Sequence, residues 1–428
     1  MHRPSPRVLR RVTKWLASSA AFAFLAAGPG MAAAATPAHA APTQAAPARA
    51  ATGTYQQVTG FGSNPGNLQM YEYVPAGLPS GAPLVVALHG CTQSADDYYN
   101  HSGWPKFADQ WKFAVVFPQT TTSNNIQKCF QWFDPAKDAR GGTEAASIVQ
   151  MVSYAEQKHG SDAHRVFVTG LSAGGGMTAD LLAAYPDVFA GGAVDSGLPA
   201  QCATSLVAAS GCQMNDQNLT PAQWGDKVRG SYPGYTGPWP RVAIWQGTAD
   251  YTVYPVNATE LRDQWTNVWG ISQTPSSTHS LSGGTTQSVY NDANGKPAVE
   301  VYSISGMGHG LAVDPGSGAD QCGSTGAYFL GAICSTSYTA KFWGLDGSDG
   351  TNPGDPGDPG DPGDPGGGTP QCFTATNYAQ VTAGRAHTSG GYTYANGSNQ
   401  NMGLYNVFVT HTLKETSANY YVISNSGC

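Results

Sequence analysis

The sequence predicts an α/β fold with a mostly parallel sheet, followed by a small, mainly β domain at the C-terminus. Strand-like and helix-like segments alternate over residues 53–345, as a parallel sheet requires. A serine motif lies between one such strand and helix, and a Gly-Asp-Pro run separates the last segment, residues 372–428, from the rest. At 428 residues the chain is long enough for a large core and a second small domain.

The serine motif Gly170-Leu171-Ser172-Ala173-Gly174 fits the pattern G-x-S-x-G. Residues 165–169 before it predict a buried strand, and residues 175–185 after it predict a helix. In that context the motif is the nucleophile elbow of an α/β-hydrolase fold, whose tight turn points the serine hydroxyl out of the sheet. The alternative is a plain glycine-rich turn between strand and helix. We predict that Ser172 is a nucleophile.

A serine needs a base and an orienting acid, which follow it in the order acid, histidine in this fold. The apolar strand candidate 242–245 runs into Gln246–Val253, so Asp250 lies just past the carboxyl end of a strand. We predict that Asp250 is the acid; the alternative is a helix N-cap. Asp195, also at a strand end, is the other candidate for the acid.

The base is predicted to be His309. Residues 299–304 alternate like a strand, and the glycine-rich loop around His309 follows them. His279 lies in a polar run and has the character of a surface residue. The alternative for His309 is a loop histidine on the surface.

An oxyanion hole is expected beside the serine. The apolar strand 84–88 ends in His89-Gly90-Cys91-Thr92, the early loop that donates a backbone N–H in this fold. We expect the two donors to be the N–H groups of Cys91 and Ala173, each stabilising the developing alkoxide by about 3 kcal/mol. We interpret His89 as a structural histidine bonded to the loop backbone.

The first 40 residues have the pattern of an export signal. A basic start is followed by the apolar run 15–27 and by a small-residue tract that ends in Ala38-His39-Ala40. We therefore expect a signal peptide at 1–40, a disordered lead at 41–52 and a secreted, extracellular protein. The apolar run is short and interrupted by glycine and proline, and no other stretch approaches a membrane span, so no membrane anchor is expected.

The net charge excludes the usual polyanion-binding classes. The chain carries a formal charge of −7, and its first 40 residues hold five basic residues and no acidic one, so the remainder is at −12. Nucleic acid and anionic membranes are therefore not expected as partners. No C-x-x-C pair with zinc spacing is present, and the proposed chemistry needs no metal and no cofactor. We expect a monomer.

Eight cysteines in an exported chain predict four disulfides, for which 105 pairings are possible. Proximity along the chain favours Cys202–Cys212 and Cys322–Cys334. Cys372 and Cys428 bracket the last segment and would close it. That pairing leaves Cys91 with Cys129, which would tie the oxyanion loop to a neighbouring loop.

The segment 346–371 is predicted to be a linker. Its Gly-Asp-Pro run has a proline at every third residue, which prevents helix and sheet and favours a semi-stiff spacer. The following domain has fewer than 60 residues, so it needs its disulfide. Its many tyrosines and phenylalanines are expected to divide between a core and an adhesive face.

These residues together resemble the extracellular poly(3-hydroxybutyrate) depolymerases of bacteria, in their non-permuted catalytic type. The catalytic part carries the resemblance in four blocks: Leu88–Gln93, Gly170–Met177, Gly247–Asp250 and Gly308–Gly310. The tail carries it in four further blocks: Asn377–Ala379, Ala383–Ala386, Gly397–Asn406 and Asn419–Ile423. The tail is the more specific part of the resemblance, because related esterases share the catalytic blocks.

The resemblance implies a secreted serine esterase that hydrolyses insoluble short-chain polyhydroxyalkanoates to hydroxyacid oligomers. It also implies that residues 372–428 bind the polyester, and we expect Arg385, Tyr405 and Tyr420 to contact the polymer. One alternative is a feruloyl or acetylxylan esterase of plant cell walls with a carbohydrate-binding module. Another is an adhesion protein with a decayed hydrolase domain, which the filled positions 172, 250 and 309 disfavour.

Overall fold

The computed structural model describes residues 53–348 and 372–424, apart from positions 399, 407, 418 and 419. For residues 415–417 and 420 it describes the backbone without the side chains. The expected signal peptide at 1–40, the lead at 41–52 and nearly all of the linker at 346–371 lie outside the described residues.

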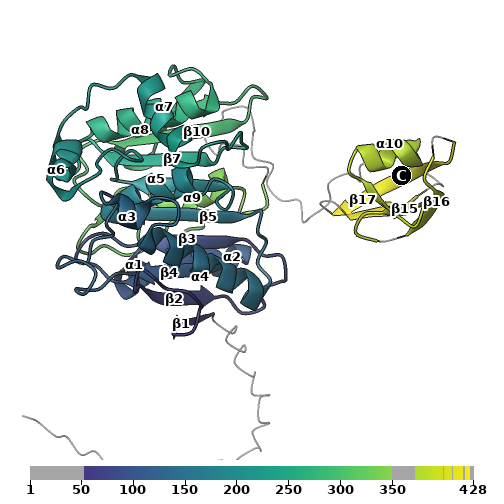
Figure 1. Cartoon of the computed structure of the whole chain (residues 1–428), viewed down its shortest axis with the longest axis horizontal. Coiled ribbons are helices and arrows are strands. Elements are labelled where there is room, and N and C mark those ends of the chain that lie inside the picture. Colours follow the sequence, from purple (N-terminus) through teal and green to yellow (C-terminus); the bar gives the residue numbers. More distant parts are fainter. Residues whose placement is uncertain (1–52, 349–371, 399, 407, 418–419, 425–428) are drawn as a thin grey trace, which may run out of the picture. The chain divides into compact units, whose positions relative to one another are not determined.

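Residues 53–348 form a ten-stranded mixed sheet in the order β1-β2-β4-β3-β5-β6-β7-β10-β9-β8 (Figure 1). The strands from β4 to β10 in this order pair in parallel, and the strands outside them pair antiparallel. The predicted mostly parallel sheet is therefore confirmed. The strands are β1 (Thr54–Val58), β2 (Gln69–Val74), β3 (Leu84–Leu88), β4 (Ala114–Gln119), β5 (Val166–Leu171), β6 (Gly191–Asp195), β7 (Arg241–Gly247), β8 (Ser277–Leu281), β9 (Thr285–Asn291) and β10 (Pro297–Ile304).

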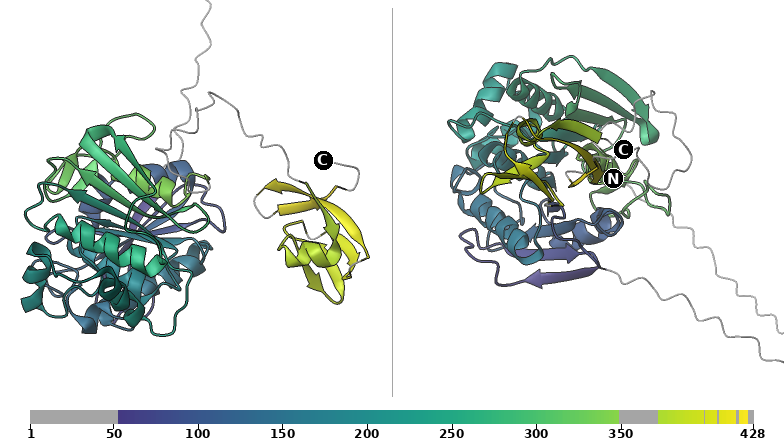
Figure 2. Two further views of the ribbon diagram at one scale, coloured as in Figure 1. Left: turned by 90° about the horizontal axis from the view of Figure 1, so that it is seen from above. Right: turned by 90° about the vertical axis from the view of Figure 1, so that its right-hand side faces the viewer.

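Helices connect and cover these strands, as parallel pairing requires (Figures 1 and 2). They are α1 (Ala95–His101), α2 (Trp104–Trp111), α3 (Pro135–Asp138), α4 (Thr143–His159), α5 (Ala173–Ala184), α6 (Leu206–Met214), α7 (Pro221–Ser231), α8 (Val256–Trp269) and α9 (Ser335–Phe342). Two short strands, β11 (Leu311–Val313) and β12 (Phe329–Gly331), and a 3-10 turn (Ser282–Gly284) complete this part.

The core consists of two buried layers, one on each face of the sheet. Alternate residues of a strand point to opposite faces, so Val168 of β5 packs with residues of α4, α5 and α8, whereas Phe167 packs with residues of α2 and α9. On the second face Trp343 stacks on Phe167 and on Trp104, with ring centroids 4.8 Å and 5.7 Å apart. These layers hold the carboxyl ends of the parallel strands at one edge, where the predicted site residues lie.

Residues 372–424 form two antiparallel three-stranded sheets and one helix. The first sheet has the order β13-β17-β18 and the second the order β14-β15-β16. The elements are β13 (Cys372–Thr376), α10 (Asn377–Thr382), β14 (Ala386–Ser389), β15 (Tyr392–Ala395), β16 (Asn401–Leu404), β17 (Thr410–Ser417) and β18 (Tyr420–Ile423). Their buried apolar core is small: Ala386, Ala395, Met402, Leu413 and Tyr421. The expected mainly β character of this region is confirmed.

Three disulfides occur among the described residues, in the pairings favoured above: Cys91–Cys129, Cys202–Cys212 and Cys322–Cys334. The fourth pairing, Cys372 with Cys428, stays a prediction because Cys428 lies outside the described residues. No helix in the described ranges is both long and apolar enough to cross a membrane.

Candidate active site

Ser172 lies in a sharp turn between β5 and α5. Its backbone has φ 59° and ψ −117°, a strained conformation for a residue with a side chain, and its N–H donates to the Asp195 carbonyl at 2.9 Å. A Cβ at Gly170 would come within 2.3 Å of the Gly174 carbonyl oxygen, and one at Gly174 within 2.5 Å of the Leu88 carbonyl oxygen. Only glycine fits at both positions, so the motif residues build the turn that exposes the serine.

The structure brings Ser172, Asp250 and His309 into one hydrogen-bonded chain. Asp250 follows β7, and His309 lies in the loop after β10. The Ser172 hydroxyl donates to Nε2 of His309 at 2.9 Å, and Nδ1–H of His309 donates to Oδ2 of Asp250 at 2.8 Å. The side chain of His309 is 9% exposed and that of Asp250 is fully buried. This arrangement lets the imidazole take the serine proton while the carboxylate holds its tautomer.

Gln246 is a further residue of this chain, and the sequence did not single it out. Its amide Nε2–H donates to Oδ2 of Asp250 at 3.2 Å and to the Val253 carbonyl at 3.1 Å. The other carboxylate oxygen, Oδ1, accepts the N–H groups of Thr252 and Val253, both at 2.9 Å. Residues other than His309 therefore donate hydrogen bonds to both oxygens of the Asp250 carboxylate and fix its orientation.

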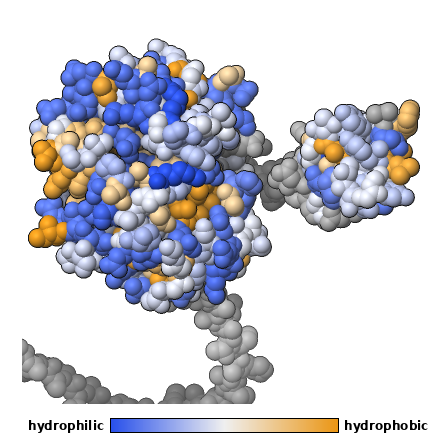
Figure 3. Space-filling model, viewed as in Figure 1, coloured by the Kyte–Doolittle hydropathy of each residue, from blue (hydrophilic) through white to orange (hydrophobic). Residues whose placement is uncertain are grey.

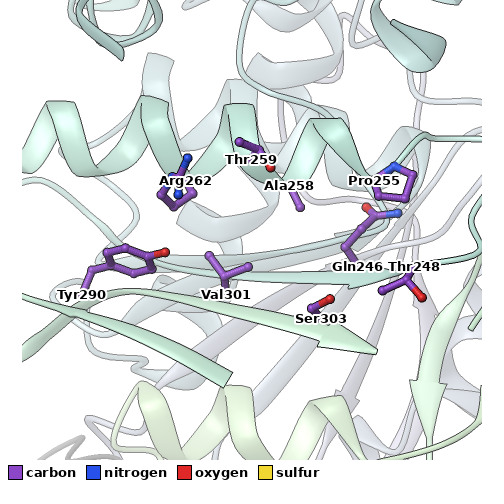
Figure 4. Close-up of a pocket in the computed structure, with 9 residues that line it drawn as sticks. All are labelled: Gln246, Thr248, Pro255, Ala258, Thr259, Arg262, Tyr290, Val301 and Ser303. Carbon is purple, nitrogen blue, oxygen red and sulfur yellow. The ribbon is translucent and has the colours of Figure 1, made fainter. Parts of the chain in front are cut away.

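Figure 4 shows Gln246 among the residues that line a further hollow. Its side chain lines a hollow of about 250 Å³ between α8 and strands β7, β9 and β10, together with Thr248 of the β7 end and Arg262 of α8. The hollow does not include the serine, the histidine or the aspartate. Gln246 therefore lines this hollow and also hydrogen-bonds to Asp250.

Asp195, the other candidate for the acid, has a different environment. Its carboxylate accepts a hydrogen bond from the Thr169 hydroxyl at 2.9 Å, and burial raises its pKa to about 8. A carboxyl group with that pKa is largely neutral at pH 7 and cannot stabilise an imidazolium. The backbone carbonyl of Asp195, which holds the Ser172 N–H, is the part of this residue that supports the site.

His89 fixes the orientation of the oxyanion loop. It is fully buried, which lowers its pKa to about 4. Its Nε2 accepts the Thr120 N–H at 3.2 Å, so Nδ1 carries the proton and donates to the Gly90 carbonyl at 2.7 Å. Because a trans peptide places C=O and N–H on opposite sides, the N–H of Cys91 points away from His89.

The two expected oxyanion donors lie beside Ser172. Cys91 lines the same hollow as Ser172, and Ala173 is the next residue in the chain. Gly90, Cys91 and Ser172 line one hollow of about 240 Å³. Ala173 is the first residue of α5, so its N–H has no partner within the helix and lies at the positive end of the helix dipole. The disulfide Cys91–Cys129 and the Thr92 N–H bond to the Gln127 carbonyl, at 2.6 Å, hold the loop in place.

Two residues that the sequence did not single out also line this hollow. Gln213 enters it from α6, and Tyr328 enters it from the turn before β12. The Tyr328 ring meets the His309 ring edge-on, with centroids 6.0 Å apart. The aromatic residues of the segment 198–240, which carries α6 and α7, do not line it: Trp224 is buried, and Tyr235 packs against Trp239 near Pro186.

The described residues contain no group of three or more His, Cys, Asp or Glu side chains arranged to hold a metal ion. His279, the other downstream histidine of this part, is half-buried in β8 and hydrogen-bonds the Ser277 hydroxyl at 3.0 Å. It does not line the hollow around Ser172.

In the C-terminal part, the three predicted polymer-contacting residues occupy different environments. Arg385 is half-buried, donates to Oε1 of Gln380 at 2.6 Å and lies over the Phe373 ring at 4.5 Å. Tyr405 is 40% exposed. Tyr420 begins β18, and its side chain is outside the described ones.

Several known proteins resemble this chain in sequence. The family model "Esterase PHB depolymerase" matches residues 68–289, just over half of the chain. Poly(3-hydroxyalkanoate) depolymerase C of Paucimonas lemoignei is 52% identical over 292 residues, which cover 68% of this chain and 70% of the relative. Feruloyl esterase B of Talaromyces stipitatus is 38% identical over 277 residues, or 63% of this chain and 76% of the relative.

A solved structure agrees with the fold. The acetyl xylan esterase from Aspergillus awamori has a TM-score of 0.55 and 34% identity, and the match covers 60% of this chain and 94% of that one. The matched family, the elbow turn and the observed sheet all describe one kind of catalyst, a carboxylic ester hydrolase. On this evidence the chain belongs to the Esterase PHB depolymerase family.

Proposed function

We propose that this protein hydrolyses the ester bonds of insoluble short-chain polyhydroxyalkanoates such as poly(3-hydroxybutyrate), releasing hydroxyacid oligomers. The observation that carries the proposal is the hydrogen-bonded chain Ser172–His309–Asp250 in a sequence 52% identical to a poly(3-hydroxyalkanoate) depolymerase. The more distant feruloyl esterase, at 38% identity, makes cell-wall esters the second choice.

The mechanism uses an acyl-enzyme. Ser172 attacks an ester carbonyl while His309 takes its proton, and the alkoxide that forms accepts hydrogen bonds from the N–H groups of Cys91 and Ala173. His309 then gives the proton to the leaving alcohol, and Asp250 stabilises the imidazolium. Water, deprotonated by His309, hydrolyses the acyl-enzyme to the hydroxyacid product. No step calls for a metal or a cofactor.

Exposed apolar side chains around the hollow support a solid, apolar substrate. Met214 follows Gln213, Tyr251 precedes Thr252 and Ile126 precedes Gln127, and each of these neighbours lines the hollow. Every exposed large apolar residue described between 53 and 348 lies on a loop or helix that also contributes a lining residue to the hollow. These residues are Ile126, Leu206, Val207, Met214, Tyr251, Tyr254 and Tyr328. Figure 3 shows apolar surface gathered where Figure 1 labels α6, the helix of Leu206 and Val207. Apolar patches of this kind mark interaction sites.

Residues 372–428 are proposed to bind the polyester, with 53–345 as the catalytic domain and 346–371 as the linker. Phe408 is 88% exposed, Tyr378 48% and Tyr405 40%, and the rings of the two tyrosines lie 5.7 Å apart. Arg385 and Tyr420 remain candidates for polymer contact. Adsorption through this domain would keep the catalytic domain at high local concentration on the solid.

Secretion is proposed from two observations. The first 40 residues have the pattern of a signal peptide. The described residues contain three disulfides, which form and persist in oxidising, extracytoplasmic compartments. We propose an extracellular monomer whose partner is the polyester.

The acetyl xylan esterase structure, with 34% identity, favours a cell-wall polysaccharide esterase as the second candidate. Adsorption separates the two candidates, because a polyester-binding domain adsorbs to polyester granules and a carbohydrate-binding module adsorbs to cellulose or xylan. The same full-length protein is offered both solids.

Deleting residues 372–428 tests the division of labour. We expect the truncated enzyme to hydrolyse a soluble butyrate ester at the full-length rate and to lose most of its activity on polyester film. Film degradation at the full-length rate would refute the assignment of the C-terminal domain while leaving the catalytic assignment intact.

A further inference from the structure

A second hollow, of about 210 Å³, adjoins the hollow at Ser172. The two hollows share three lining residues: Thr92, Gln93 and Tyr328. Each volume is below the ~300 Å³ at which ligand sites usually begin, whereas the two together exceed it. At this edge of the sheet, only the two hollows together therefore reach the usual size of a ligand site.

The boundary between the hollows is a fixed structure. Gln93 is 5% exposed; its side-chain oxygen accepts the Gly90 N–H at 2.7 Å, and its amide donates to the Ala327 carbonyl at 3.4 Å. The Tyr328 backbone, at φ 65°, is held by the Leu311 N–H, which donates to its carbonyl at 2.8 Å. Gln93 and Tyr328 thus join the oxyanion loop to the turn before β12.

The second hollow combines an apolar wall with a polar rim. Phe329 is buried and stacks on the His101 ring, with centroids 4.9 Å apart and planes at 24°. The Ser324 hydroxyl, 2.7 Å from Nδ1, holds that imidazole in place. Thr92, Asp97 and Ala327, all exposed, complete the opening. Such a lining suits a short aliphatic unit that carries one ester carbonyl, because the rings accept its methyl group and the Thr92 hydroxyl can donate to the carbonyl.

We propose that this second hollow, bounded by Thr92, His101, Ala327 and Phe329, is a subsite for the hydroxyacyl unit next to the scissile ester. This inference rests on the proposed polyester substrate. Tyr328 then lines both hollows: one side of its ring contacts the bound polyester, and its edge contacts the His309 ring. The subsite makes the enzyme select oligomers over esters of a single acid.

Filling the hollow tests the subsite. In the full-length enzyme, Ala327→Trp places a large ring in the second hollow and leaves the lining of the first unchanged. The two substrates are a soluble tetramer of 3-hydroxybutyrate and p-nitrophenyl butyrate. We expect the ratio of kcat/KM for the tetramer to that for the aryl ester to fall about tenfold, through a higher KM for the tetramer.

Two further variants control the experiment. Ala327→Leu should give a smaller fall in the ratio, and it keeps the test valid if the tryptophan variant folds poorly. Ala319→Trp changes an exposed alanine that lines neither hollow and should leave the ratio unchanged.

Either of two results for both Ala327 variants would overturn the subsite: an unchanged ratio, or equal losses on both substrates. Failure of the proposed function has a different signature, because the wild-type enzyme would then cleave the aryl ester but not the tetramer. That result would overturn the polyester substrate and the subsite together.

Discussion

In residues 53–348 the side chains assigned to chemistry are buried and fixed by hydrogen bonds. In residues 372–424, by contrast, Tyr378, Tyr405 and Phe408, which are assigned to adsorption, are exposed. Asp250 is fully buried and its carboxylate accepts four hydrogen bonds. Phe408 is 88% exposed. Proton transfer depends on geometry within a few tenths of an ångström, but adhesion to an irregular solid depends on apolar area. The two parts therefore should respond differently to substitution.

The largest expected effect separates the two buried aspartates. Asp250→Asn removes the charge that faces His309 and should lower kcat by about 10⁴-fold on a soluble ester, as loss of a triad acid does. Asp195→Asn removes a carboxyl group that is mainly neutral at pH 7 and should retain most of the activity. Steady-state kinetics on one aryl ester measure both. Equal losses in the two variants would contradict the assignment of the acid.

A smaller effect is expected one contact further out, at Gln246. Gln246→Met keeps the length of the side chain and removes its hydrogen bond to the carboxylate, which should lower kcat about 10- to 100-fold at nearly constant KM. Thr259→Val is the matched control, since Thr259 lines the same hollow (Figure 4) without a hydrogen bond to Asp250. A change confined to KM, or a similar loss in the control, would contradict a positioning role for Gln246.

Substitutions at the exposed aromatic residues of 372–424 should affect adsorption and leave catalysis unchanged. Phe408→Ser should weaken adsorption to polyester film about tenfold, the equivalent of one aromatic side chain no longer buried, and leave soluble ester hydrolysis unchanged. A depletion assay with film measures adsorption, and Thr388→Ala, at another exposed position of this part, should adsorb normally. Unchanged adsorption of Phe408→Ser would move the binding face elsewhere in the domain.

A separate effect, on stability and not on activity or adsorption, concerns Asp195. Its pKa is about 8 in the folded protein and about 3.9 in the unfolded chain, so unfolding releases a proton between these pH values. The free energy of unfolding therefore falls as pH rises from 4 to 8, by up to about 1.4 kcal/mol per pH unit from this group. Asp195→Asn lacks this loss, so its Tm relative to wild type should rise across that window and level off above pH 8. A constant difference in Tm would contradict the buried, neutral carboxyl.

Residues close together in the sequence explain why the fold, and the meeting of Ser172, Asp250 and His309, could be predicted. The strand, turn and helix around Ser172 are local, and the strand ends before Asp250 and His309 are visible as apolar runs followed by loops. The roles of Gln246, Gln213 and Tyr328 depend instead on which distant segments the sheet brings beside them. No period or motif in the sequence encodes that proximity.

The C-terminal part was harder to predict for a related reason. Tyr421 is 6% exposed and Tyr392 is 44% exposed, yet both stand in short strands with mixed polar and aromatic residues. With two small sheets, one residue of register decides which ring enters the core. The segment 198–240 shows the same limit, because its aromatic residues do not line the hollow at Ser172, whereas Gln213 does.

Product release from poly(3-hydroxybutyrate) film by the wild type and by Ser172→Ala, measured beside a feruloylated xylan, tests the nucleophile and the substrate together. We expect soluble hydroxyacid oligomers from the wild type, none from the variant, and no ferulate from either. Film hydrolysis by Ser172→Ala would contradict the nucleophile, and release of ferulate without hydroxyacids would contradict the substrate.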